Sequence, residues 1–207
     1  MENQAVQQRI HVETSIEFEI FTDSSISEEN LSSLAELLSM SYLEFSESVS
    51  RGYMKDLVNV RSRIGPGKEQ IVMRDSSKQI IGCVCLYDHS PDQHAKNFPK
   101  NTAYLRFLAI HPSLRGQGLG KRLVQFCLIR AKTQGNEFLV RKRFGDNWPP
   151  SSIESDLLPP QALHSPLYME SARKLYDSMG FSRHRGADFV NSMDFPVFAF
   201  IHPLREA

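Results

Sequence analysis

Residues 108–120 read LAIHPSLRGQGLG, and this stretch decides the fold that the sequence predicts. Its first three residues close an almost continuously apolar run, residues 103–110, which is typical of a central strand covered on both faces. His111-Pro112 ends that strand, because proline has no N–H with which to extend a hydrogen-bonded ladder. Three glycines then open an amphipathic helix, for which Gly135 is a suitable C-terminal cap. The sequence therefore predicts a buried strand, a glycine-rich turn and a helix in direct succession.

Before this unit, strand and helix patterns alternate along the chain. Residues 16–21 alternate apolar and polar side chains, which is the pattern of a half-buried strand. Ser27 is a favourable N-cap for the helix that follows, and Glu28 and Glu29 suit the positive end of its dipole. We then expect a second amphipathic helix from Val49 to the turn at Gly65-Pro66-Gly67, and an antiparallel hairpin of strands 70–73 and 79–87.

After the unit, the pattern is interrupted once. Residues 138–140 indicate another short strand, but the stretch from Asp146 to Pro166 carries five prolines and little periodicity. We expect residues 146–166 to be a long irregular insertion, because too little chain follows for a second hydrophobic core. A helix pattern closed by Gly180 and an alternating strand at 195–201 complete the chain. The whole chain, residues 1–207, is predicted to be one mixed α/β (α+β) domain with its core at about 16–201.

The overall composition excludes several classes of protein. The 207 residues carry 24 Lys and Arg against 24 Asp and Glu, so the formal net charge is +0 and a basic coat for nucleic acid is excluded. No segment approaches the roughly 20 apolar residues that cross a bilayer, and the N-terminal residues lack the apolar core of a secretory signal. Three cysteines are too few for a disulfide scaffold, and Cys83-x-Cys85 has no second Cys or His pair at zinc spacing. We therefore expect a cytoplasmic protein with no metal and with no nucleic-acid or membrane partner.

The glycine-rich turn carries the chemical signal. Glycines at a helix start let a ligand approach the backbone, and the first N–H groups of a helix have no intrahelical partner. These donors and the helix dipole favour phosphate, with Arg115 and Lys121 as mobile positive charges beside it. A dinucleotide fingerprint would need glycine where Leu123 stands, and a Walker P-loop would need Ser or Thr where Arg122 stands. A phosphate-bearing ligand is therefore the first functional prediction, and a glycine-rich turn without a ligand is the alternative.

Two segments carry a resemblance to a known family. Residues 115–120, RGQGLG, follow a central strand ending in Leu-Ala-Ile, and they match the acyl-CoA signature Q/R-x-x-G-x-G/A in spacing and context. Residues 172–181, ARKLYDSMGF, look like the A-x-x-L-Y-x-x-x-G-F helix that covers the cofactor thiol in the same family. On these motifs and the order of its predicted elements, the chain resembles the GNAT-type N-acetyltransferase superfamily.

The resemblance implies a fold, a reaction and a cofactor. The implied fold is a GNAT-like three-layer one, in which helices flank a mostly antiparallel sheet that splays open between its fourth and fifth strands. Acetyl-CoA would lie in that gap, with its pantetheine arm paired to strand backbone and its pyrophosphate bound by amides of the turn. The implied cofactor-binding residues are Leu108, Ala109, Ile110, Arg115, Gly116, Gln117, Gly118, Leu119, Gly120 and Lys121.

The resemblance also implies catalytic roles for direct attack of a neutral amine on the acetyl thioester. A main-chain N–H near Leu108 would donate to the thioester oxygen, and Tyr176 would protonate the departing thiolate or, alternatively, pack in the core. Many family members carry Glu where Tyr104 stands, so the usual general base is missing here. Many also carry Asn where Met169 stands, and methionine cannot hydrogen-bond a pantetheine amide well. His164 is a substitute base, because histidine titrates near neutrality, or else a loop histidine. A water relay would make a dedicated base unnecessary.

The residues do not identify the acceptor. A neutral chain gives no preference between a small-molecule amine and a peptide amine. Transfer of a different acyl group, such as succinyl, is one alternative function, and a noncatalytic acyl-CoA-binding regulatory module is another. Pairing of two copies through the terminal strand would give a homodimer, which the family resemblance allows.

Overall fold

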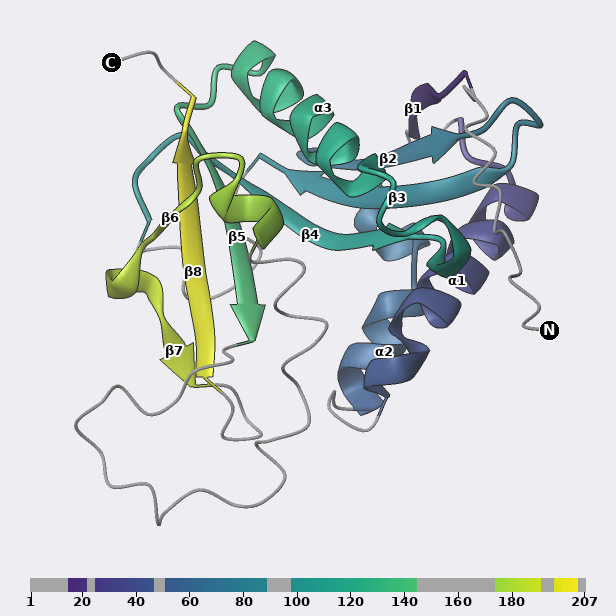
Figure 1. The fold of residues 1–207 in the computed structure, drawn as a ribbon, viewed down its shortest axis with the longest axis horizontal. Helices are drawn as coiled ribbons and strands as arrows, with labels where there is room; N and C mark the ends of the chain where they lie inside the picture. The colour runs from purple at the N-terminus through teal and green to yellow at the C-terminus, as the bar shows by residue number, and fades with distance from the viewer. Residues whose placement is uncertain are drawn as a thin grey trace, which may run out of the picture.

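The strands that the structure describes lie in one sheet with helices on both faces (Figure 1). The computed structural model describes residues 15–21, 25–46, 51–88, 98–144, 174–190 and 196–204. The strands are β1 (Glu17–Phe21), β2 (Lys68–Arg74), β3 (Ile80–Tyr87), β4 (Thr102–Ile110), β5 (Phe138–Phe144), β6 (Ser182–Arg183), β7 (Phe189–Val190) and β8 (Pro196–Pro203). The α-helices are α1 (Glu28–Tyr42), α2 (Arg51–Val58) and α3 (Leu119–Thr133), and residues 174–177 are also helical. Short 3-10 turns are η1 (Leu43–Phe45), η2 (Arg61–Arg63), η4 (Pro112–Leu114) and η7 (Arg185–Ala187).

The sheet is mixed but mostly antiparallel. Within the described residues it has eight strands in the order β1-β2-β3-β4-β5-β8-β6, with β7 paired to β8. Every strand pair is antiparallel except β4 with β5, which is parallel. The predicted hairpin is present as β2 and β3, and the predicted strand-turn-helix unit as β4, η4 and α3. The fold class expected from the sequence is therefore confirmed.

The sheet forks between β4 and β5. Their pairing covers only four positions, from Thr102↔Phe138 to Leu105↔Arg141. Beyond the fork, β4 continues to Ile110 beside β3, whereas β5 continues to Phe144 beside β8. Figure 1 shows the two strands diverging from their shared start, with β5 turning away from β4. The splay that the family resemblance implies is therefore present between these two strands.

Two hydrophobic cores make the sheet the middle layer of three. Buried residues of α1 and α2 pack with one face of the sheet, which includes Cys83, Cys85, Tyr104 and Phe107. Buried residues of α3 pack with the other face, where Tyr176 also lies. β4 has buried residues in both cores, so it is covered on both faces, as the sequence predicted. We call the two sides of the sheet the α1/α2 face and the α3 face.

The local sequence explains where α1 begins and why α2 is short. Ser27 caps α1, because its hydroxyl accepts a hydrogen bond from the N–H of Asn30 at 3.2 Å. The second helix was expected to continue to Gly65, but α2 ends at Val58, so that expectation is wrong at its C-terminal end. The guanidinium of Arg63 donates to the carbonyls of Asp56 and Leu57 at 2.6 and 2.7 Å, which satisfies the end of α2 before the glycine turn.

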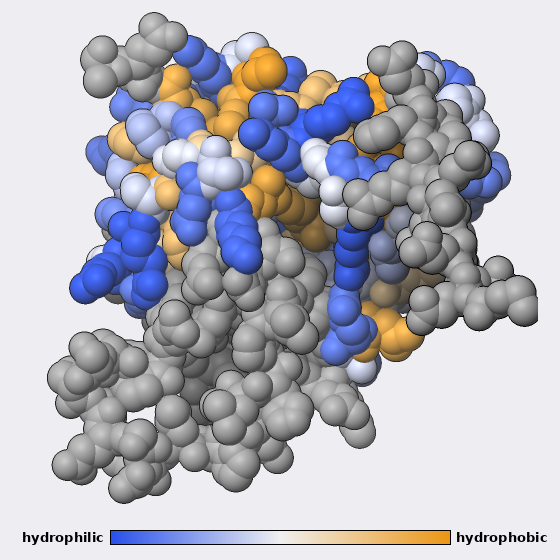
Figure 2. Space-filling view, viewed as in Figure 1, coloured by the Kyte–Doolittle hydropathy of each residue, from blue (hydrophilic) through white to orange (hydrophobic). Residues whose placement is uncertain are grey.

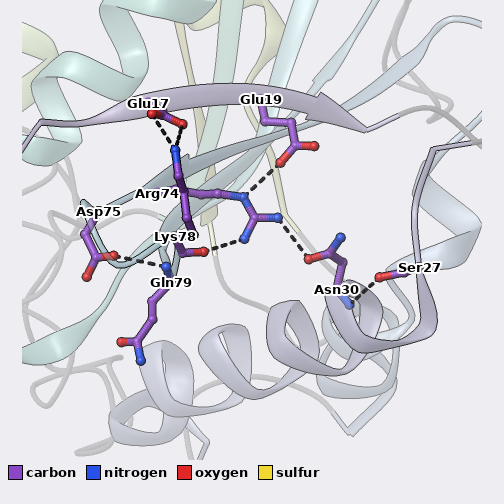
Figure 3. Close-up of polar contacts among 8 residues, drawn as sticks. All are labelled: Glu17, Glu19, Ser27, Asn30, Arg74, Asp75, Lys78 and Gln79. Carbon is purple, nitrogen blue, oxygen red and sulfur yellow. Dashed lines mark hydrogen bonds and ion pairs between the residues drawn. The ribbon is translucent and has the colours of Figure 1, made fainter.

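A polar network fastens the edge strand β1 to the rest of the domain (Figure 3). Arg74 of β2 is its centre, and its Nε lies 2.8 Å from a carboxylate oxygen of Glu19 on β1. The same guanidinium donates to the carbonyl of Lys78 in the hairpin turn and to the amide oxygen of Asn30 on α1. Lys78 pairs with Glu17 at 2.6 Å. One arginine thus connects β1, the β2–β3 turn and the start of α1.

Several sequence expectations fall outside the described residues. These are the insertion at 146–166 with His164, and also Met169 and Val49. The helices in the described residues are all too short or too polar to span a bilayer.

Candidate functional site

A β-bulge marks the point where β4 leaves β5. Cys85 pairs with Arg106 and Cys83 with Ala109, so Phe107 and Leu108 together oppose the single residue Val84. Phe107 has a φ of +54°, a backbone conformation that residues other than glycine rarely adopt. A bulge bends its strand and redirects side chains. Here it begins two residues after Leu105, the last position of β4 that pairs with β5.

The bulge is followed by a strand edge that faces the fork. The N–H of His111 donates to the carbonyl of Ile81 at 2.9 Å, and Ala109 pairs with Cys83 two residues earlier. Backbone groups alternate in direction along an antiparallel strand, so those of Ala109 face β3 while those of Leu108 and Ile110 face the gap. No strand in the described part of the chain pairs with β4 along this edge.

Two hydroxyl groups of α1 bind the carbonyls on this edge. Ser41 donates to the carbonyl of Ile110 at 3.2 Å, and Tyr42 donates to the carbonyl of Leu108 at 3.3 Å. These contacts fix the end of α1 against β4. The N–H groups of Leu108 and Ile110 are the donors that the edge still presents to the gap.

The glycine-rich turn leads from this edge into α3. Gly116 and Gly118 have φ values of +76° and +77°, and a Cβ at either position would meet nothing within 4 Å. Glycine is required at both positions because other residues rarely adopt a positive φ, and the space beside the two residues is open. The first intrahelical bond runs from the N–H of Arg122 to the carbonyl of Gly118 at 3.1 Å, and no side chain of the described residues caps this end. The preceding N–H groups of α3 are thus available to an anion.

Gly120 brings three elements together. A Cβ at Gly120 would lie 3.6 Å from the side chain of Leu175 and 3.9 Å from that of Ile110. The helical residues 174–177, the start of α3 and the end of β4 are therefore neighbours. The two segments that carry the family resemblance meet at this place. Figure 2 shows a hollow with a hydrophobic floor over β4, below the N-terminal end of α3.

The charged and polar residues of the turn differ in their surroundings. Arg115 was expected to be a mobile charge, but it forms an ion pair with Glu44 and donates to the carbonyl of Ser41 at 2.8 Å. It is therefore held by the end of α1, and the expectation of mobility is wrong. Gln117 and Lys121 are exposed beside the open N-terminus of α3.

Tyr176 lies in the core on the α3 face. Its side chain is 1% exposed, and its ring packs edge-on against Phe181 at 5.2 Å between ring centres. The packing role predicted for Tyr176 is thus present. The acid role is not tested by this arrangement and stays a prediction.

The α1/α2 face carries Tyr104, which the sequence singled out, and two arginines, Arg63 and Arg106, which it did not. Tyr104 is 6% exposed and packs edge-on against Phe98, and the nearby Arg63 is 2% exposed. Arg106 was visible in the sequence as the one charge within the apolar run 103–110. Arg63 gave no such signal, because its neighbours in the chain are polar and its burial depends on contacts with β4.

The three cysteines are not nucleophiles near neutral pH. All are buried, and burial raises the pKa of each thiol, that of Cys85 to about 11 and those of Cys83 and Cys127 further. The thiolate is the reactive form of cysteine, so a raised pKa makes these side chains inert.

Among the described residues, no group of three or more His, Cys, Asp or Glu is placed to hold a metal ion.

A family model decides the membership of this chain. Residues 32–143, more than half of the chain, match the model described as the acetyltransferase (GNAT) family. The chain belongs to the GNAT family. The matched segment runs from α1 to β5, and so it includes the bulge, the open edge of β4 and the glycine-rich turn. The family that the motifs indicated is confirmed.

Solved structures support the same fold across nearly the whole chain. A GNAT-family acetyltransferase from Staphylococcus aureus Mu50 superposes with a TM-score of 0.61 at 16% identity, covering 91% of this chain and 100% of that one. An aminoglycoside 6'-N-acetyltransferase complexed with coenzyme A gives 0.60 at 13% identity, covering 91% and 98%. The ribosomal-protein-S18-alanine N-acetyltransferase from Escherichia coli gives 0.54 at 13% identity, covering 92% and 96%. No curated protein sequence matches the chain. These superpositions show the GNAT fold, and the different acceptors named for the two enzymes show that this fold does not decide the acceptor.

Proposed function

We propose that this GNAT protein is an acetyl-CoA-dependent N-acetyltransferase that transfers acetyl to a primary amine by direct attack. The observation that carries the proposal is the continuity of two backbone surfaces. The open edge of β4 at Leu108 and Ile110 leads directly to the exposed N-terminus of α3. An extended amide-bearing arm fits the first surface, and a diphosphate fits the second.

The residues at hand fit coenzyme A. The N–H groups of Leu108 and Ile110 would bind the carbonyl oxygens of the pantetheine arm, and the amides from Gly116 to Lys121 would bind the pyrophosphate. Because the backbone of Ala109 is paired with β3, we assign it a packing role beside the arm. Arg115 would support the site by holding the turn against α1, and the exposed Lys121 and Gln117 would contact phosphate oxygens.

The chemistry requires three actions from the protein. Bound acetyl-CoA supplies an activated acyl group. The N–H of Leu108 would polarise the carbonyl oxygen of that group, because it points into the gap just beyond the bulge. The hydroxyl of Tyr176 would deliver a proton to the leaving thiolate. The amine would lose its proton to His164 or to a water relay, since Tyr104 stands where many family members carry Glu.

Two assays test this function. Calorimetric titration with coenzyme A should show one site per chain, and acetyl-CoA with a broad panel of amines should release free thiol. Binding without thiol release for any amine would favour the second candidate function, a noncatalytic acyl-CoA-binding module. The observation in favour of that candidate is the buried tyrosine at position 104 in place of a carboxylate. Repeating the release assay with succinyl-CoA distinguishes the acyl group.

The role of Tyr176 has its own test. The Tyr176→Phe variant keeps the ring and its packing against Phe181, so its stability should change little. If the hydroxyl is the acid, turnover falls roughly 100-fold or more while the affinity for coenzyme A is retained. Unchanged turnover would leave Tyr176 with the packing role alone.

A further inference from the structure

A cluster of charged and aromatic side chains lies on the α1/α2 face at the fork. Arg106 is the first residue of β4 after Leu105, the last that pairs with β5. The bulge places Arg106 and Phe107 on the same face, and the guanidinium carbon of Arg106 lies 4.7 Å from the centre of the Phe107 ring. Arg63 of η2 lies over the same ring at 4.3 Å. Two guanidinium groups therefore share one aromatic ring where the acyl group would end.

The charges of this cluster do not cancel. Among the described residues, the ion pair of Arg106 is with Asp56, at 3.8 Å, and the two side chains are 34% and 49% exposed. Arg63 is almost fully buried and donates to the backbone carbonyls of Asp56 and Leu57 rather than to a carboxylate. Its Nε is buried without a hydrogen-bond partner in the described part of the chain. Within the part of the chain that the structure describes, two cations thus stand against one carboxylate.

We propose that this cluster binds an anionic group of the acceptor, so that the acceptor is an amine that also carries a carboxylate. This inference rests on the proposed N-acetyltransferase function. Phe107 holds the guanidinium of Arg106 by stacking, and the exposed part of that guanidinium presents N–H donors in the planar fork that matches a carboxylate. The contact with Asp56 is too long for a hydrogen bond, so an incoming carboxylate displaces no hydrogen-bonded partner there.

Electrostatics disfavours the opposite class of acceptor. A polyamine would bring several positive charges to a fork that already holds Arg63 and Arg106, and like charges near a low-dielectric core repel strongly. An amino-acid-like acceptor brings a carboxylate together with its amine. Its carboxylate would pair with Arg106, and Asp56 would remain beside the amine or the solvent. The cluster therefore selects for acidic amines.

The test uses matched pairs of acceptors. The full-length protein, acetyl-CoA and a panel of free amino acids are assayed by thiol release beside the carboxamide of each amino acid, which keeps the amine and the side chain. We expect kcat/KM for the acids to exceed that for the amides by tenfold or more, in order of magnitude. Arg106→Gln should lower kcat/KM for the acids roughly 10- to 100-fold, mainly through KM, and leave the amides within about twofold. Arg106→Lys, which keeps the charge but not the fork, should recover part of the loss.

Arg61→Gln is the matched control, because Arg61 pairs with Glu28 at the other end of α1, away from the fork. This variant should keep the preference of the unchanged protein. Equal use of acids and amides by the unchanged protein would overturn the inference, as would an equal loss for both classes in Arg106→Gln. In those cases acetyl transfer itself still stands. Absence of thiol release with every amine would overturn the proposed function, and this inference with it.

Discussion

The two faces of β4 differ in the chemical groups that they present. On the α3 face, the strand packs against aliphatic side chains of α3, and the nearby glycine-rich turn offers backbone N–H groups. On the α1/α2 face, the same strand carries Arg106 and contacts Arg63, and a buried glutamine, Gln70, lies hydrogen-bonded to Cys85. The α3 face is suited to a ligand that is recognised through backbone. The α1/α2 face is suited to one that is recognised through side-chain charge.

This difference explains why a ligand bound through backbone can be shared by a whole family, whereas the acceptor bound through side chains varies. Backbone donors at the start of α3 need only glycines and a helix, so many sequences can supply them. Side-chain recognition on the other face depends on which residues η2, α2 and β4 bring to the fork.

The largest expected effect is a loss of stability when Arg63, on the α1/α2 face, is replaced. Arg63→Ala removes two hydrogen bonds to the end of α2 and the contact with Phe107. We expect the free energy of unfolding to fall by about 2–4 kcal/mol in urea titration. Arg61→Ala, at the more exposed neighbour that pairs with Glu28, should lose at most about 0.5 kcal/mol. Equal stability of the two variants would contradict the structural importance assigned to Arg63.

The second effect concerns the α3 face alone. Gly118→Val forces a branched residue into a φ of +77° at the start of α3, which costs about 1–2 kcal/mol and places a side chain where the diphosphate would bind. The dissociation constant for coenzyme A, measured by calorimetry, should rise roughly 10- to 100-fold. Gly186→Val is the control, since Gly186 has open space and no positive φ. An unchanged affinity in Gly118→Val would show that the turn does not hold the cofactor.

The third effect uses thiol ionisation to compare the charge on the two faces. Burial raises the pKa of Cys85 to about 11, and Arg63 and Arg106 limit that rise. Cys127 on the α3 face is also buried, and burial raises the pKa of its thiol further. Single-cysteine variants titrated by thiolate absorbance should therefore show that Cys85 ionises first, and that Arg106→Gln raises its pKa. Ionisation of Cys127 before Cys85 would contradict the positive charge assigned to the α1/α2 face.

The raised pKa of Cys85 also has a consequence for stability. Its pKa is above the usual value of 9.0, at about 11, so the folded protein binds this proton more tightly than the unfolded chain does. The contribution is fully present below pH 9 and is lost as the pH rises toward 11. Cys85→Ala should therefore reduce the dependence of unfolding free energy on pH in that window.

The smallest effect lies away from both faces of the fork. Arg74→Gln breaks the network that joins β1, the hairpin turn and α1 (Figure 3). We expect a loss of about 1 kcal/mol in unfolding free energy, because the contacts are partly exposed. Affinity for coenzyme A and the rate of thiol release should stay within about twofold of the unchanged protein. A larger loss of activity would mean that the β1 edge is coupled to the fork.

The α3 face was predictable from sequence because its determinants are local. Three signals follow one another within residues 103–120: the apolar run, His111-Pro112 and the three glycines. Each of them predicts a single local conformation, which is a buried strand, the end of that strand and a helix start. The α1/α2 face was not predictable, because Arg63 and Phe107 meet only in the folded chain. The end of α2 was misjudged for the same reason, since Arg63 reaches back to its last carbonyls. The bulge gave no signal either, because Phe107 adopts a positive φ without being glycine.

The central claim is that the edge of β4 beyond the fork binds coenzyme A through its backbone. Amide hydrogen exchange, resolved by residue with and without coenzyme A, tests it most directly. The amides of Leu108 and Ile110 face the gap and should exchange fast alone and slowly with coenzyme A, whereas that of Ala109, paired with Cys83, should be slow in both states. Unchanged exchange at Leu108 and Ile110 in the presence of saturating coenzyme A would contradict the account.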